Sequence, residues 1–192
     1  MRKKSHIRLG KYLIDEIPGL RRHRLALYIG CILPDLEPSF IYRKHQIETT
    51  ISIVEDEISK ISRDTTIDGY FCRHVGVITH YLSDYCTLPH NKLFTCGIME
   101  HCRYEKTLQR SLKWYLEYKR CIPRYIDDSM SIASIIYSIH GRYINSAKYE
   151  YEHKYGKGNI ENDSKYILYI NTSIVKYLVG RMVPDIVLAT VI

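Results

Sequence analysis

Histidines and carboxylates gather between residues 80 and 105 at spacings that suit metal coordination. His80 and Asp84 are four residues apart, and His101 and Glu105 repeat that spacing, so on a helix each pair would share one face. His90 follows a proline, where the first of these helices must already have ended, and would extend from a turn. Three imidazoles and two carboxylates within 26 residues form a ligand set for zinc or a similar borderline metal.

Each pair also has an ordinary structural interpretation, as a surface ion pair or a hydrogen-bonded core histidine. The two pairs together, with His90 between them, favour a metal site that takes further ligands from elsewhere in the chain. Asp35 lies between two prolines at the end of a strongly apolar helix, where it is either a site residue or a turn cap. Gly76 lies one turn before His80, and its missing side chain leaves room for a neighbouring group. His74 would lie about 120° around the same helix from His80 and is expected to be a core histidine.

Apolar residues recur at three- and four-residue steps through most of the chain, and no region sustains a two-residue alternation. The pattern predicts helices at about residues 5–17, 25–32, 51–61, 66–86, 99–121, 128–145 and 165–179. Ser5 is expected to cap the first helix, the sixth could continue through residues 148–153, and residues 156–164 are expected to form a loop. Pro184 opens a last apolar turn. We therefore expect an all-α fold, with residues 1–192 forming a single-domain bundle of six to eight helices.

The formal net charge of +7 favours anionic partners such as phosphates, anionic lipid surfaces or nucleic acid, without choosing among them. The basic cluster Arg21–Arg24 is most simply a solvated face, with phosphate or membrane contact as the alternative. Six cysteines without a C-x-x-C or disulfide-scaffold pattern indicate free thiols in a reducing compartment. No apolar core follows the basic N-terminus, and no stretch reaches the ~18–20 apolar residues of a membrane span. We expect a cytoplasmic protein without a cleaved leader or a transmembrane segment.

The motifs resemble the zinc-dependent phospholipase C family, whose fold is shared by the fungal single-strand-specific nucleases. The family has a His-Tyr-x-Gly/Thr-Asp segment leading through a proline to a histidine, and then His-x-x-x-Glu. Here the first segment reads His-Tyr-Leu-Ser-Asp from His80 to Asp84, before Pro89-His90 and then His101 to Glu105. The family also has an early histidine on its first helix and an aspartate followed by a histidine. The matching order in this chain is His6, Asp35, His45, His80, Asp84, His90, His101 and Glu105.

The resemblance implies that these eight side chains hold a cluster of zinc ions. One ion would take Asp35, His45, His80 and Asp84, and a second would take His90, His101 and Glu105 and keep positions open for water and substrate. A third would take His6 and share Asp84. Secreted members complete the third site with the amine and carbonyl of an N-terminal tryptophan, whereas here five residues precede His6 and none is tryptophan. We therefore expect two zinc ions and a third position with too few side-chain ligands.

Zinc lowers the pKa of bound water from ~15.7 to about 7, and metals ~3.5–4 Å apart can hold the attacking and leaving oxygens of a phosphodiester. The expected activity is therefore hydrolysis of a phospholipid or related phosphate ester by metal-bound hydroxide, with Asp35 as general base or purely as a ligand. Peripheral contact with an anionic membrane stays open. One alternative is a single-strand nuclease that uses the basic surface and tyrosine stacking. The other is a non-catalytic, metal-stabilised binding module, which a single closed zinc site would favour.

Overall fold

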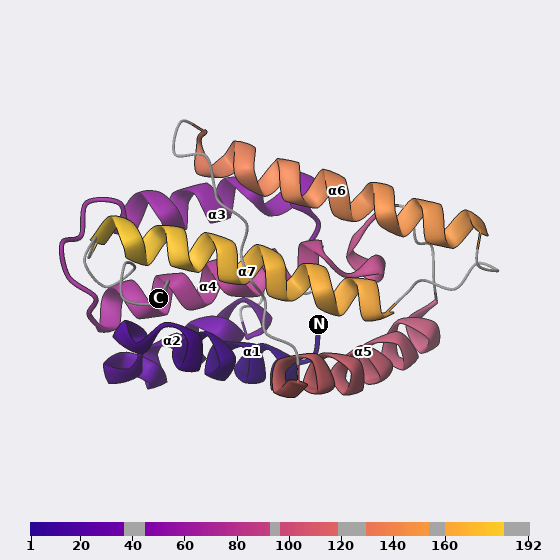
Figure 1. The fold of residues 1–192 in the computed structure, drawn as a ribbon, viewed down its shortest axis with the longest axis horizontal. Coiled ribbons are helices and arrows are strands. Elements are labelled where there is room, and N and C mark those ends of the chain that lie inside the picture. The colour runs from indigo at the N-terminus through magenta and orange to yellow at the C-terminus, as the bar shows by residue number, and fades with distance from the viewer. Residues whose placement is uncertain (37–44, 93–96, 119–129, 154–159, 183–192) are drawn as a thin grey trace.

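The computed structural model describes residues 1–36, 45–92, 97–118, 130–153 and 160–182. Its helices are α1 (Lys3–Glu16), α2 (Arg24–Ile32), α3 (Ile47–Ile61), α4 (Gly69–Tyr85), α5 (Ile98–Tyr118), α6 (Ile132–His153) and α7 (Ile160–Met182) (Figure 1). Short 3-10 helices also occur, namely η1 (Pro18–His23), η2 (Leu33–Asp35) and η4 (Leu88–His90). No strand occurs in the described ranges, so the expected all-α fold is confirmed.

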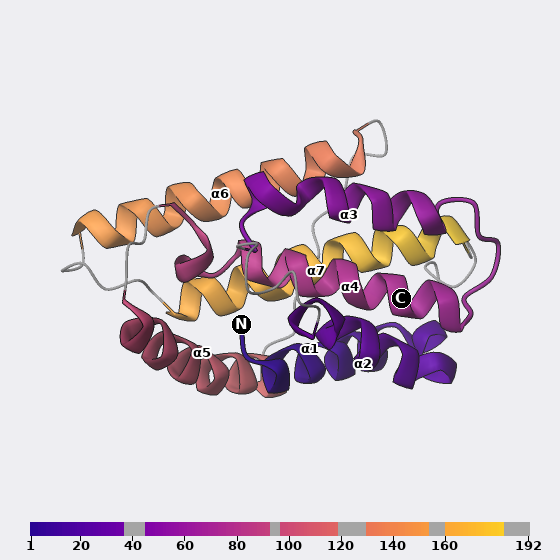
Figure 2. The same cartoon turned by 180° about the vertical axis from the view of Figure 1, so that it is seen from behind.

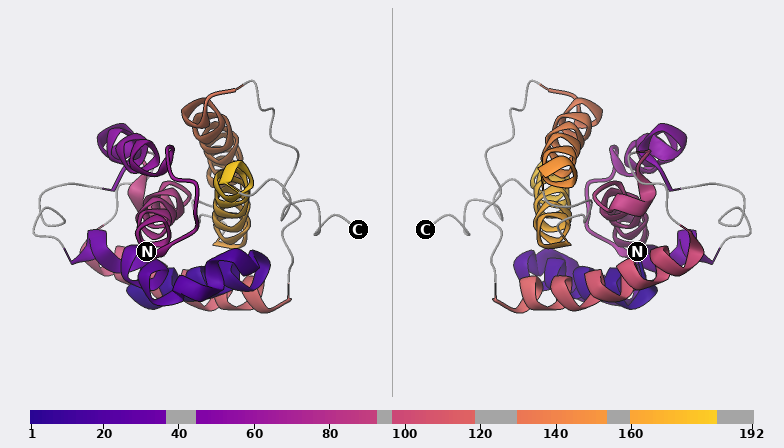
Figure 3. Two further views of the ribbon diagram at one scale, coloured as in Figure 1. Left: turned by 90° about the vertical axis from the view of Figure 1, so that its left-hand side faces the viewer. Right: turned by 90° about the vertical axis from the view of Figure 1, so that its right-hand side faces the viewer.

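The helix α4 is the centre of the bundle. From Phe71 to Tyr85 every residue except Arg73 is buried, as expected for a helix that carries apolar residues around most of its circumference. It packs against α2, α3 and α7. Seen end-on, α3 and α4 form one stack, α6 and α7 form a second, and α1, α2 and α5 lie across the same end of both (Figure 3). The same layers appear from behind in Figure 2. Functional groups on α4 can therefore be reached by side chains from several other helices.

The α2 and α4 backbones touch at a pair of glycines. A Cβ atom on Gly30 would lie 2.0 Å from the Arg73 carbonyl oxygen, and one on Gly76 would lie 2.4 Å from the Leu27 carbonyl oxygen. Only glycine permits backbones to approach this closely. The space predicted beside Gly76 is thus filled by the α2 main chain, which sets the distance between α2 and the histidine one turn further along α4.

Two sequence predictions about helix starts are wrong. Ser5 does not cap α1, because the helix begins at Lys3 after Arg2 and Ser5 is buried within it. The expected loop over residues 156–164 is already helical from Ile160. Asp163 is polar but 1 % exposed, and it accepts hydrogen bonds from tyrosines on neighbouring helices. Hydrogen bonds to neighbouring helices therefore allow a polar residue of this segment to be buried within α7, which its composition did not indicate.

Several other boundaries agree with the sequence pattern. α6 runs to His153, so the helix does continue past residue 145. α4 begins at Gly69, and its N-cap Asp68 accepts a hydrogen bond from the Phe71 amide at 2.8 Å. The expected last turn after Pro184, the expected end of the fifth helix at Cys121 and the expected start of the sixth at Asp128 lie outside the described residues. None of the described helices combines the length and the hydropathy that crossing a bilayer requires.

Candidate metal centre

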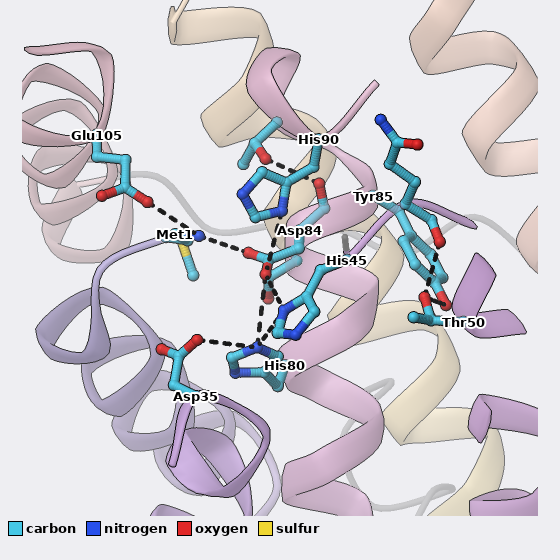
Figure 4. A network of polar contacts seen from close by, with 12 residues as sticks. Met1, Asp35, His45, Thr50, His80, Asp84, Tyr85, His90 and Glu105 are labelled. Carbon is cyan, nitrogen blue, oxygen red and sulfur yellow. Dashed lines mark hydrogen bonds and ion pairs between the residues drawn. The ribbon is translucent and has the colours of Figure 1, made fainter. Parts of the chain in front are cut away.

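The eight candidate ligands come from six separate segments and form neighbouring groups around the end of α4. Figure 4 shows six of them, namely Asp35, His45, His80, Asp84, His90 and Glu105. α4 carries His80 and Asp84, which are both 0 % exposed. The others are His6 in α1, Asp35 in η2, His45 just before α3, His90 in η4, and His101 and Glu105 in α5. Distance in sequence is thus no guide to distance in space here, since residues 6 and 105 belong to the same cluster.

The Asp84 carboxylate is the central group of this cluster. Its Oδ2 atom lies 3.1 Å from His45 Nδ1, 3.5 Å from His80 Nε2 and 3.3 Å from His90 Nδ1. Its Oδ1 atom lies 3.6 Å from His6 Nε2. Imidazoles from four segments therefore face one carboxylate, which is the arrangement expected of a ligand shared between adjacent metal positions.

The main chain of α2 fixes the orientation of His80. The Nδ1–H group of His80 donates a hydrogen bond of 2.9 Å to the Cys31 carbonyl oxygen, which becomes accessible because Gly30 and Gly76 let the helices touch. With its proton held at Nδ1, the ring turns Nε2 towards the cluster, where it lies 3.1 Å from His45 Nδ1 and 3.7 Å from Asp35 Oδ1. Hydrogen bonds of this kind to carbonyl oxygens orient metal-binding histidines and raise their basicity.

The ligand atoms form three groups, and within each group every ligand atom lies within 4.8 Å of the others. The groups are His6, His80 and Asp84; Asp35, His45 and His80; and His90, His101 and Glu105. The third group coincides with the set expected for one zinc ion. The second holds three of the four residues expected for another, and the fourth, Asp84, lies 3.1 Å from His45.

The amino group of Met1 is a ligand candidate that sequence reasoning missed. Its nitrogen lies 2.7 Å from Asp84 Oδ1 and 3.4 Å from Glu105 Oε1, and the residue is 6 % exposed. The signal was the short distance along the chain from the terminus to His6, because only five residues precede that ligand candidate and two of them lie before the start of α1. The position that lacked ligands in the sequence therefore has a nitrogen donor next to it.

Burial and mutual charges set the protonation of the cluster. Burial lowers the pKa of His80 to about 4 and holds the pKa of His6 well below its ordinary value, so both imidazoles are neutral near pH 7. Burial alone would raise the pKa of Asp84, but the Met1 ammonium and the surrounding imidazoles hold it well below its ordinary value. Burial, and then the Asp84 charge, raise the pKa of Asp35 to about 6. Neutral imidazole and ionised carboxylate are the forms that bind a divalent cation.

The buried ring nitrogens of His6 indicate whether these residues fit a metal ion. Within the described ranges, neither ring nitrogen of the fully buried His6 has such a partner, although its ring stacks on His80 with centroids 4.0 Å apart. Leaving a buried imidazole unsatisfied costs free energy, and a cation beside His6 Nε2 and Asp84 would remove that cost. Imidazole nitrogens and carboxylate oxygens are also the donors that zinc takes, so the residues fit the group.

A second polar network holds η4, and with it His90. Tyr104 donates to Asp163 Oδ2 at 2.5 Å and accepts a hydrogen bond of 3.1 Å from the Leu88 amide. Tyr143 of α6 donates to Asp163 Oδ1 at 2.9 Å. Because Tyr104 lies one residue before Glu105, the network joins two segments that carry ligand candidates to α7. Sequence reasoning gave no sign of it, since Asp163 lay in a presumed loop.

His74 lies outside the three ligand groups, as expected. It is 5 % exposed, and its Nδ1 atom lies 2.5 Å from Glu57 Oε2 on α3, which confirms its reading as a core histidine. The four described cysteines, Cys31, Cys72, Cys86 and Cys102, are free thiols.

The bundle of helices thus brings together three groups of histidines and carboxylates that could hold metal ions. The sequence model of the family described as Zinc dependent phospholipase C matches residues 5–150. The chain therefore belongs to the zinc-dependent phospholipase C family, over a stretch that contains all eight candidate ligands. Neither the comparison with curated proteins nor the comparison with solved structures found a match.

Proposed function

We propose that this chain is a zinc-dependent phosphodiesterase that hydrolyses a phospholipid or a related phosphate ester. The observation that carries the proposal is the position of Asp84, whose carboxylate belongs to the first ligand group and contacts His45 of the second and His90 of the third. One carboxylate that joins three ligand groups supports neighbouring metal positions rather than a single isolated one. Zinc bound there would supply a nucleophilic water with a pKa near 7 and would neutralise charge on the phosphate.

The chain's own residues would transfer the protons of the reaction and would form the opening through which the phosphate enters. Asp35, a carboxylate of the second ligand group, would accept a proton from the attacking water while that water's oxygen forms its bond to phosphorus. The phosphorus–oxygen bond to the leaving alcohol would then break, and that oxygen would take up the proton that Asp35 had accepted. His101 and Glu105 have side chains that are 36 % and 20 % exposed, so the third group forms the accessible rim at which a phosphate can enter.

This accessible rim favours catalysis over a non-catalytic binding module. A structural zinc site is closed by four protein ligands, whereas a catalytic site keeps a position open. The third group offers three ligands, and all three residues are partly exposed. We propose two zinc ions in the second and third groups, and a third ion at His6 and Asp84 that takes the Met1 amine as a further ligand. A cytoplasmic location, expected from the sequence, is part of the proposal.

The test compares zinc content and turnover in the full chain and in Asp84→Asn. The substrate is bis(p-nitrophenyl) phosphate, a soluble phosphodiester that needs no membrane. We expect zinc-dependent turnover that falls about 100-fold or more in the variant, together with a lower zinc content. Asp68→Asn is the matched control, because it makes the same change on the same helix at an N-cap where asparagine serves equally well. A zinc-loaded wild-type chain without turnover would contradict the proposal.

A further inference from the structure

The outer face of α2 exposes apolar side chains that the bundle does not use. Leu27, Gly30 and Cys31 are buried on the face that packs against α4. On the other face, Leu25 is 69 % exposed and Ile29 is 53 % exposed. They are four residues apart and therefore lie one above the other. A single exposed leucine is ordinary, but two that share a face form a small apolar surface.

Three arginines adjoin this surface. Arg21, Arg22 and Arg24 are exposed, and none forms an ion pair with any residue that the structure describes. Together with the neighbouring residues of Arg21–Ala26 they line a shallow hollow of about 580 Å³. The surface therefore offers two kinds of binding group, namely arginines that form no ion pair with the described residues and exposed aliphatic side chains.

We propose that this surface, defined as Arg21, Arg22, Arg24, Leu25 and Ile29, docks the protein on a bilayer that contains anionic phospholipid. The arginines would contact the phosphate headgroups, and Leu25 and Ile29 would enter the boundary between headgroups and acyl chains, as in interfacial amphipathic helices. The proposal rests on the proposed function, because it names how the site meets a lipid substrate.

Two other occupants fit the surface less well. Single-stranded nucleic acid is held by cations interleaved with several aromatic side chains on which bases stack. Here one aromatic ring, His23, lines the hollow, and the two strongly exposed apolar side chains beside the arginines, Leu25 and Ile29, are aliphatic. A second copy of the chain in a two-fold interface would bring the same three arginines against each other. An anionic lipid surface complements both the charge and the apolar groups.

The surface is connected to the candidate metal centre through the chain. α2 passes directly into η2, which ends at Asp35, and the next residue, Leu36, is 58 % exposed. The same chain segment thus carries exposed aliphatic side chains beside the arginines and another one residue after a ligand candidate. Docking would therefore place on the lipid the helix α2, whose C-terminal end leads directly to Asp35.

Vesicle flotation of the zinc-loaded full chain tests the proposal. We expect binding to vesicles of phosphatidylcholine with phosphatidylglycerol, weakening with added salt, and little binding to phosphatidylcholine alone. R21Q/R22Q/R24Q should lower the partition coefficient about 100-fold, since each of the three basic side chains contributes roughly fivefold. The control R103Q/K106Q/R110Q removes three exposed cations from α5 and should lower it much less.

The aliphatic pair is tested in the same way. L25S/I29S should weaken binding to the anionic vesicles, whereas Y118S/Y137S, which removes two exposed apolar side chains elsewhere, should not. Equal binding to both vesicle types, or wild-type binding by both α2 variants, would overturn the proposal. Two further results would overturn it. One is an oligonucleotide whose binding is lost in R21Q/R22Q/R24Q but kept in L25S/I29S, and the other is a dimer of the wild-type chain that R21Q/R22Q/R24Q no longer forms. Turnover of bis(p-nitrophenyl) phosphate should be unchanged in the α2 variants, and because flotation needs no turnover, failure of docking and failure of the enzymatic proposal are distinguishable.

Discussion

The amino nitrogen of Met1 lies 2.7 Å from Oδ1 of Asp84, at the centre of a buried cluster of imidazoles and carboxylates. Burial would lower the pKa of this amine, but the Asp84 and Glu105 carboxylates raise it, so without metal it is an ammonium ion that pairs with both. The amine therefore occupies the place of a cation, and a bound zinc ion would take it in its deprotonated form as a ligand.

Extending the chain by two residues before Met1 should lower the zinc content without unfolding the bundle. The extension converts the amine to an amide, which is neither a cation nor a good ligand, and it adds atoms in a buried position. Elemental analysis should show about one zinc ion fewer per chain than in the unextended protein. The same two residues added after Ile192 serve as the control. Equal zinc content in all three proteins would show that the Met1 amine is not a ligand.

Gly30→Ala should destabilise the protein by about 3 kcal/mol or more, because the new methyl group would clash with backbone atoms that cannot move aside. Chemical denaturation measures the effect on the free energy of unfolding. Gly141→Ala is the control, since nothing lies within 4 Å of a Cβ at that position in α6, and it should stabilise by about 0.5–1 kcal/mol. A Gly30→Ala protein as stable as the wild type would show that the α2–α4 contact is looser than described.

Tyr104→Phe should destabilise by about 1–3 kcal/mol, because it leaves the buried Asp163 carboxylate and the Leu88 amide each without one hydrogen bond. It should also weaken zinc binding, since η4 carries His90. Tyr115→Phe makes the same change on the same helix, but its hydroxyl reaches Glu161 in an exposed position and should matter little. Competition with a zinc chelator separates the two variants. Equal zinc affinity in both would mean that the network supports only the fold.

Near pH 7, Asp35→Asn should raise the stability of the metal-free protein relative to the wild type and lower that of the zinc-loaded protein. Burial, and then the Asp84 charge, raise the folded-state pKa of Asp35 from 3.8 to about 6. Between these values the folded protein holds a proton that the unfolded chain has lost, so this group's contribution to stability falls as pH rises through that window. Asparagine does not titrate, so the metal-free variant should gain stability relative to the wild type from pH 4 to pH 7.

With zinc bound, the order at pH 7 should reverse, because the ionised carboxylate becomes a ligand that asparagine replaces poorly. Thermal unfolding with added zinc and with a chelator gives both comparisons. A difference between variant and wild type that stays constant from pH 4 to pH 7 would contradict the pKa of Asp35. A zinc-loaded variant as stable as the loaded wild type would contradict its role as a ligand.

The helices and the family could be predicted from the sequence because both depend on local patterns. The apolar repeats gave seven helices close to those observed, and the spacing of His80 and Asp84 put both side chains on one face of α4. The Met1 amine and Asp163 were missed because neither belongs to a local pattern. The first is a main-chain group that any sequence has, and the second depends on two tyrosines from other helices.

The ligand candidates lie on six segments between α1 and α5, and an ion among them would tie those segments together. An unfolded chain offers no such arrangement, so most of the free energy of zinc binding would be added to the free energy of folding. The zinc concentration of the compartment would then be a variable of the folding equilibrium, and scarcity of zinc would lower the amount of folded protein as well as its activity.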